Sequence, residues 1–156
     1  MASDIVLRKV IEDDLQIFYE QQLDPVATEM AAFPARAQEP FLSHWKKIMA
    51  DETVMLRTIL FDGKVAGNIV SFEQSGEREV GYWIEREYWD KGIATESLRQ
   101  FLEEVKSRPV YAHVAKHNVA SRRVLEKCGF TVLREDKGIA VTPWEEVEEF
   151  ILILEH

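Results

Sequence analysis

The segment from Glu79 to Leu98 most constrains how this chain can fold, because three local signals follow one another in it. Residues 79–85 alternate as a strand does, Lys91-Gly92 supplies a turn, and apolar residues then recur at helical spacing. The first N–H groups of a helix have no intrahelical partner, and the helix dipole favours an anion there. The sequence therefore predicts a candidate phosphate site at this turn.

Length and residue counts limit the other classes of site. With 156 residues, the chain can bury one core and is too short for two ordinary domains, so a single domain over residues 1–156 is expected. Its one cysteine, Cys128, excludes an internal disulfide framework and a cysteine-rich zinc site. The four histidines show no ligand spacing, and no metal site is expected.

The charge balance bears on partners and location. A formal net charge of −9 argues against a sequence-independent nucleic-acid binder and suits a small cationic substrate, although acidic balance more commonly serves solubility. Residues 1–9 lack the apolar core of a signal peptide, and no later segment reaches the length of a membrane span. We expect a cytoplasmic protein that binds no membrane, as a monomer or a homodimer.

The rest of the pattern predicts an α/β (α+β) fold: about four helices layered on a central mixed, mostly antiparallel sheet of about seven strands. Asp62-Gly63 is a strong hairpin signal, and the strands on either side of residues 86–108 are expected to run parallel. Strands are expected near Ile5 and Leu7, at Val54–Phe61, Val65–Phe72, Arg78–Glu85, Pro109–Ala115, from Phe130 and at Glu149–Leu154, and helices after Glu12, at Phe41–Met49, through Ala94–Val105 and at Val119–Cys128, with an irregular or partly helical loop at Pro25–Pro40.

Two motifs resemble those of the GNAT superfamily of N-acetyltransferases, and the likeness extends over nearly the whole chain. The run Trp89-Asp90-Lys91-Gly92-Ile93-Ala94 resembles the superfamily's Gln/Arg-x-x-Gly-x-Gly/Ala turn, although Trp89 replaces the usual Gln or Arg. The run Asn118 to Phe130 resembles the helix beside the pantetheine arm, with its Lys-x-Gly-Phe ending. Within the superfamily, the chain is most similar to the RimJ/RimL-like branch.

This resemblance implies acetyl-CoA as co-substrate and assigns the residues that hold it. The turn would bind the pyrophosphate, and parallel strands splayed around Ile84 and Val114 would pair with the pantetheine amides through backbone groups. The residues implied in cofactor binding are Trp83, Ile84, Trp89, Asp90, Lys91, Gly92, Ile93, Ala94, Thr95, Asn118 and Ser121.

Two residues are candidates for the catalytic base. Glu79 lies on the same strand face as Gly81 and Trp83 and is the first candidate for the base that deprotonates an amine; the alternative is a solvated carboxylate paired with a basic neighbour. His113 is either a second base or a structural imidazole.

The proton donor to the departing thiolate also has two candidates. The superfamily's usual Tyr, seven residues after Asn118, is Leu125 here, which leaves Ser121 or water as the general acid. Without the resemblance, Asn118 reads as an N-cap and Ser121 as an ordinary first-turn residue.

The predicted function is therefore an N-acetyltransferase that moves an acetyl group to a primary amine of a small molecule or a protein N-terminus. Cys128, at a helix C-terminus, is expected to be a core residue, which favours direct transfer in a ternary complex. The loop Asp24–Pro40 and the hairpin Glu73–Arg78 are expected to flank the acceptor, and Tyr82 to be a core or cleft-wall aromatic. The alternatives are an inactive acyl-CoA-binding sensor or regulatory protein and a structural domain without a ligand.

Overall fold

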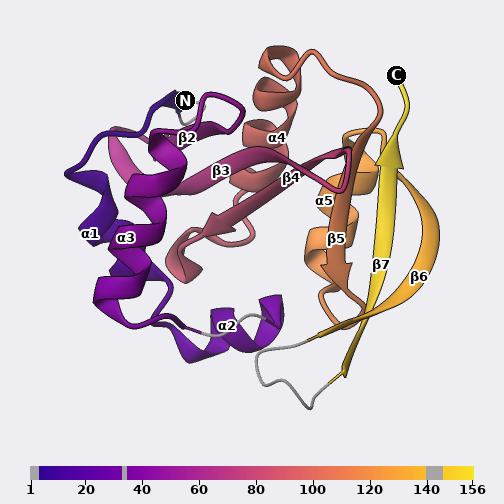
Figure 1. The fold of residues 1–156 in the computed structure, drawn as a ribbon, viewed down its shortest axis with the longest axis horizontal. Helices are drawn as coiled ribbons and strands as arrows, with labels where there is room; N and C mark the ends of the chain where they lie inside the picture. The colour runs from indigo at the N-terminus through magenta and orange to yellow at the C-terminus, as the bar shows by residue number, and fades with distance from the viewer. Residues whose placement is uncertain (1–3, 33–34, 140–145) are drawn as a thin grey trace.

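The computed structural model describes residues 4–32, 35–139 and 146–156, which form one seven-stranded sheet in the order β1-β2-β3-β4-β5-β7-β6 (Figure 1). Neighbouring strands are antiparallel except β4 and β5, which are parallel, so the expected mixed and mostly antiparallel sheet is confirmed. The elements are β1 (Ile5–Lys9), α1 (Asp14–Gln21), α2 (Pro25–Ala31), α3 (Gln38–Met49), β2 (Met55–Phe61), β3 (Lys64–Gln74), β4 (Glu77–Ile84), a 3-10 turn (Arg86–Tyr88), α4 (Ile93–Glu104), β5 (Val110–Ala115), α5 (Val119–Lys127), β6 (Thr131–Ile139) and β7 (Glu146–Leu154).

Two tight turns set the register of the central strands. Asp62 and Gly63 between β2 and β3, and Ser75 and Gly76 between β3 and β4, all have positive φ angles, as a two-residue hairpin turn matched to the strand twist requires. The second turn places Trp83 of β4 opposite Asn68 of β3 and Glu79 opposite Phe72.

Helix α2 lies in the segment Pro25–Pro40, which was expected to be an irregular or partly helical loop. Asp24 caps it by accepting a hydrogen bond from the N–H of Val26 (3.0 Å), and Pro25 occupies the first helical position, where its missing N–H costs nothing. Pro25 thus begins a helix, which agrees with the partly helical alternative, and the described chain has five α-helices where about four were expected. For the same reason α3 begins at Gln38 rather than Phe41, with Pro40 in its first turn.

Two apolar clusters cover opposite faces of the sheet. Ile69 and Val70 are consecutive on β3 and therefore point to opposite faces. Ile69 joins the cluster under α4 and α5, and Val70 packs on the cluster of α1 and α3. The sheet is thus sandwiched between the two helix pairs, and none of the described helices is long and apolar enough to cross a membrane.

A buried carboxylate ties α1 to the sheet. Asp14 is 2% exposed and accepts hydrogen bonds from both terminal nitrogens of Arg8 (2.6 and 2.9 Å), from the Thr58 hydroxyl (2.6 Å) and from the N–H of Ile11 (3.0 Å). Burial opposes ionisation, but these hydrogen bonds outweigh it and lower the pKa of Asp14.

We expect Asp14→Asn to lower the free energy of unfolding by about 3 kcal/mol at pH 7, because the neutral amide leaves Arg8 without its partner. The folded-state pKa is depressed, so this stabilisation is present above the unfolded pKa and disappears as the pH falls through the folded pKa. Urea unfolding at pH 7 and pH 3 measures both effects. The exposed Asp13→Asn is the matched control, and equal losses at the two pH values would contradict this account.

Candidate functional site

The sheet opens between its two parallel strands. β4 and β5 are paired only at Arg78 with Val110 and Glu79 with Tyr111, near the start of each strand. Beyond these pairs β4 stays with β3 and β5 with β7, and Figure 1 shows the strands running apart toward their C-terminal ends. The predicted splay around Ile84 and Val114 is therefore present.

Backbone groups of β4 face this opening at alternate residues. The N–H of Glu85 donates to the carbonyl of Ala66 on β3, so Ile84, one residue earlier, directs its own groups to the opening. The carbonyl of Ile84 accepts a hydrogen bond from Nε1 of Trp89 at 2.8 Å. Trp89, at the position where the superfamily usually has Gln or Arg, thus fixes the edge of the opening with its indole.

Trp83 is arranged differently from what the sequence suggested. Its carbonyl faces β3 so closely that a Cβ at Gly67 would lie 1.9 Å from it. The backbone of Trp83 is therefore turned to β3 and not to the opening, and only its side chain reaches the site. Ile84 alone of this pair offers backbone groups to a ligand in the opening.

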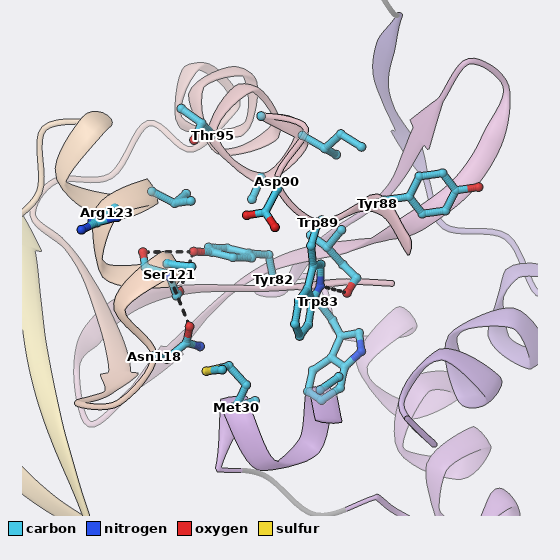
Figure 2. Close-up of a pocket in the computed structure, with 18 of the residues that line it drawn as sticks. Met30, Tyr82, Trp83, Tyr88, Trp89, Asp90, Thr95, Asn118, Ser121 and Arg123 are labelled. Carbon is cyan, nitrogen blue, oxygen red and sulfur yellow. Dashed lines mark hydrogen bonds between the residues drawn. The ribbon is translucent and has the colours of Figure 1, made fainter. Parts of the chain in front are cut away.

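A cavity of about 470 Å³ extends from the start of α4 through the opening to α2 (Figure 2). Of the predicted cofactor residues it brings together all except Lys91, which is exposed and does not line it. Residues outside the predicted cofactor set also line it, namely Ala27, Met30 and Ala31 of α2, Tyr82 of β4, Tyr88, and Ala120, Arg123, Val124 and Lys127 of α5. Those of α2 belong to the segment Asp24–Pro40 that was expected to flank the acceptor. The sequence signal for Arg123 and Lys127 was their spacing, which places both on one face of the helix after Asn118.

The start of α4 fits an anion. Gly92 is its N-cap in the left-handed conformation (φ 76°), makes no side-chain cap, and accepts the first intrahelical bond from Glu96. The N–H groups of residues 93–95 precede that bond and have no helical partner. Asp90 points its carboxylate into the cavity in Figure 2, which opposes an anion, whereas Arg123 and Lys127 on the facing helix supply positive charge.

The start of α5 forms the other wall. Oδ1 of Asn118 accepts a hydrogen bond from the N–H of Ser121 (3.2 Å), so the N-cap reading is confirmed. This bond uses one lone pair and leaves the amide NH₂ of Asn118 to donate into the cavity. Structural and ligand-binding roles are compatible at this residue.

Tyr82, expected as a core or cleft-wall aromatic, lines the cavity and brings to it a hydroxyl group for which the sequence predicted no role. Its hydroxyl oxygen lies 2.6 Å from Oγ of Ser121, and burial raises the pKa of Tyr82 to about 12. Leu125, where the superfamily usually has a tyrosine, is buried at 2% exposure. Strand alternation could have found Tyr82, because it places this hydroxyl on the face opposite Glu79, where α5 packs.

The candidate base belongs to a chain of three side chains across β4, β5 and β7. Glu79 is 9% exposed, and its Oε1 lies 3.4 Å from Nε2 of His113, whose Nδ1 lies 3.0 Å from Oε1 of Glu149. Burial raises the pKa of Glu79, while the attraction of His113 lowers it. Glu79 does not line the cavity, but Gly81, the next residue on its face, leaves open the path to Trp83.

Cys128 has the properties of a structural thiol. Its Sγ donates to the carbonyl of Thr95 (3.5 Å), and burial raises its pKa. A thiol with a raised pKa is a poor nucleophile at neutral pH. Among the residues that the structure describes, no group of three or more His, Cys, Asp or Glu side chains is placed to hold a metal ion.

Known structures define the class of fold. Spermidine N-acetyltransferase from Vibrio cholerae, solved with CoA and spermine, superposes with a TM-score of 0.84 at 16% identity over 97% of this chain and 95% of that chain. RimL, the ribosomal L7/L12 alpha-N-protein acetyltransferase solved with coenzyme A, superposes with a TM-score of 0.84 at 15% identity over 99% and 95% of the two chains. At these identities the likeness establishes the acetyltransferase fold.

Sequence comparison establishes the family. Residues 4–131 match the model of the acetyltransferase (GNAT) domain, and the chain belongs to this family. Over 108 residues it is 32% identical to the protein named "Putative ribosomal N-acetyltransferase YdaF" of Bacillus subtilis, a match that covers 65% of this chain and 58% of that relative. The predicted superfamily is thereby confirmed.

Proposed function

We propose that the protein is an acetyl-CoA-dependent N-acetyltransferase that transfers the acetyl group directly to a primary amine. The observation that carries this proposal is the opening between β4 and β5, which leads from the uncapped start of α4 to the hydroxyl pair of Tyr82 and Ser121. Acetyl-CoA bound there supplies the acetyl group as a thioester. The start of α4 with Arg123 and Lys127 would hold its phosphates, and Ile84 and Asn118 its pantetheine amides.

Glu79 removes the proton that the attacking amine must lose, directly or through a water. Its burial suits this role, because burial raises the pKa of Glu79 and a raised pKa makes a carboxylate a stronger base. His113 lies against Glu79 and holds the carboxylate in place, with Glu149 behind it. His113 is thus a positioning residue.

Tyr82 and Ser121 act on the departing sulfur. A phenol with a pKa of about 12 keeps its proton at neutral pH, and full transfer to a thiolate of pKa about 8.5 would be uphill by about 5 kcal/mol. We therefore propose that hydrogen bonding, and not full proton transfer, stabilises the departing thiolate. In this arrangement Tyr82 donates to Oγ of Ser121, and the Ser121 hydroxyl points its own hydrogen toward the sulfur. This pair takes the place of the tyrosine that is missing at Leu125.

The finer assignments rest on the relatives. The ribosomal N-acetyltransferase name of the Bacillus relative and the fold of RimL agree with the RimJ/RimL-like branch and with a protein N-terminus as acceptor, whereas the Vibrio enzyme supports a small amine. A cytoplasmic location, one domain over residues 1–156 and a monomeric or homodimeric state remain predictions.

The test is release of free CoA from acetyl-CoA with a panel of amines: a polyamine, an aminoglycoside, amino acid amides and N-terminal peptides. We expect release that depends on the amine and saturates with it. Tight CoA binding without release for any amine would instead select the acyl-CoA sensor. No change in melting temperature with excess CoA would select a structural domain, because a ligand that binds the folded state raises apparent stability.

A further inference from the structure

A second cavity of about 360 Å³ lies between α1, α3 and the sheet, and Trp83 lines both this cavity and the first. Its floor is Asn68, Val70 and Phe72 of β3, which pair with Trp83, Gly81 and Glu79 of β4. Paired residues of neighbouring strands share a sheet face, so the second cavity and the candidate base lie on one face. We refer to it as the aromatic cavity.

The lining of the aromatic cavity determines what it can hold. Phe18 and Trp45 pack with ring centroids 5.0 Å apart and Phe41 and Trp45 with centroids 6.2 Å apart, and these three rings line the cavity together with Phe72 and Trp83. A cavity of this size and composition accepts a single apolar group, and aromatic rings add edge-to-face contacts with an aromatic one.

The polar groups of the aromatic cavity exclude a polycation. Among the described residues that line it, none is acidic, and the charged or titratable ones are Arg36 and His44. The pKa of His44 is lowered, first by burial and then by the positive charge of Arg36 and Lys47. The acidic net charge of the chain had suggested a cationic substrate, but the described lining of this cavity offers no carboxylate to bind one.

We infer that the aromatic cavity is an acceptor subsite for a large apolar, preferably aromatic, side chain attached next to the reacting α-amine. The inference rests on the proposed transferase function and names its substrate class. Gly81 carries no side chain between Trp83 and Glu79, so an amine whose aromatic group occupies the cavity reaches toward the carboxylate across this position. The side-chain amide of Asn68 lines the cavity and can donate a hydrogen bond to the acceptor's carbonyl.

The experiment compares phenylalanine amide, a peptide beginning with phenylalanine, glycine amide and spermidine as acceptors. We expect kcat/KM for the two aromatic acceptors to exceed that for glycine amide by about 10- to 100-fold, the gain from burying one aromatic side chain. The comparison of phenylalanine amide with the peptide that begins with phenylalanine distinguishes a small-molecule acceptor from a protein N-terminus. Equal rates for all amines, or a preference for spermidine, would overturn the subsite and leave the transferase function intact.

A filling variant tests the location. Val70→Phe should abolish the aromatic preference, measured as the ratio of kcat/KM for phenylalanine amide to that for glycine amide, and leave the affinity for CoA within about 2-fold. Val6→Phe, the same change at an exposed strand residue, is the matched control. Should Val70→Phe not fold by circular dichroism, Phe72→Ala removes a wall without adding bulk and should also reduce the preference. An unchanged preference in either folded variant contradicts the inference.

Binding separates failure of the subsite from failure of the proposed function. Trp45 and Trp83 line the aromatic cavity, so phenylalanine amide should change the tryptophan fluorescence of the wild type and not of Val70→Phe. If no amine is acetylated but this change is seen, the cavity is a binding site and the transferase function is wrong. If amines are acetylated and no change is seen, the subsite is wrong.

Discussion

Glu79→Gln is expected to lower kcat/KM at neutral pH by about 100-fold, because the amide cannot accept the proton of the amine. The loss should depend on pH in a defined direction. Burial raises the pKa of Glu79, so the wild-type rate should rise with pH through this elevated value as the carboxylate ionises. The variant should lack this acidic limb and keep the rise at higher pH that belongs to the amine itself.

Stability and a matched control identify the cause of that loss. A carboxylate whose folded pKa is raised destabilises the folded state above its unfolded pKa, so Glu79→Gln should melt at the same or a higher temperature at pH 7. Glu103→Gln, at an exposed position of α4, should leave the rate unchanged.

His113→Gln should shift the acidic limb to higher pH, because His113 lowers the pKa of Glu79. An unchanged pH profile in Glu79→Gln would remove Glu79 as the base.

Tyr82→Phe is expected to lower kcat by about 30- to 100-fold with little change in KM for acetyl-CoA, because the lost hydroxyl orients Ser121 toward the sulfur. Ser121→Ala should have a similar effect, and the double variant should be no worse than Ser121→Ala alone. Two groups that act in series give such non-additive losses. Initial rates at saturating amine measure all three variants.

A matched phenol gives the control for Tyr82. Tyr111→Phe on β5 removes a hydroxyl outside the cavity and should leave kcat unchanged. If Tyr82→Phe lowers the melting temperature but keeps kcat, the hydroxyl pair is structural. If the losses of Tyr82→Phe and Ser121→Ala multiply in the double variant, the two residues act independently and the relay is wrong.

Local signals explain which parts of the fold could be predicted. Asp62-Gly63 and Ser75-Gly76 suit turns with positive φ angles, so the register of β3 with β4 follows from the sequence. The register of β2 with β3 follows only next to the turn, because it shifts between Ile59 and Leu60. Pro25 is a more ambiguous signal, because a proline can end a helix or begin one. The cap by Asp24 shows that here it begins α2.

The functional site also contains local features that the sequence predicts and long-range contacts that it does not. The uncapped start of α4 and the N-cap at Asn118 are local features, and both were predicted. Tyr82 and Ser121 are 39 positions apart in the sequence, and the contact of Glu79 with His113 joins the neighbouring strands β4 and β5. The strand order brings these side chains together, and a single sequence shows only which face each one takes. The turn of the Trp83 backbone away from the opening also depends on register, because its carbonyl lies against Gly67, the partner of Ile84 on β3.

The most direct test of direct transfer is the intact mass of the enzyme and of the amine after incubation with acetyl-CoA, first without and then with an accepted amine. We predict an unmodified enzyme and no CoA release without amine, followed by acetylated amine and an equal amount of CoA once amine is added. Acetyl-enzyme that forms without amine and is consumed when amine is added would contradict direct transfer. Absence of acetylated product with every amine would contradict the transferase itself.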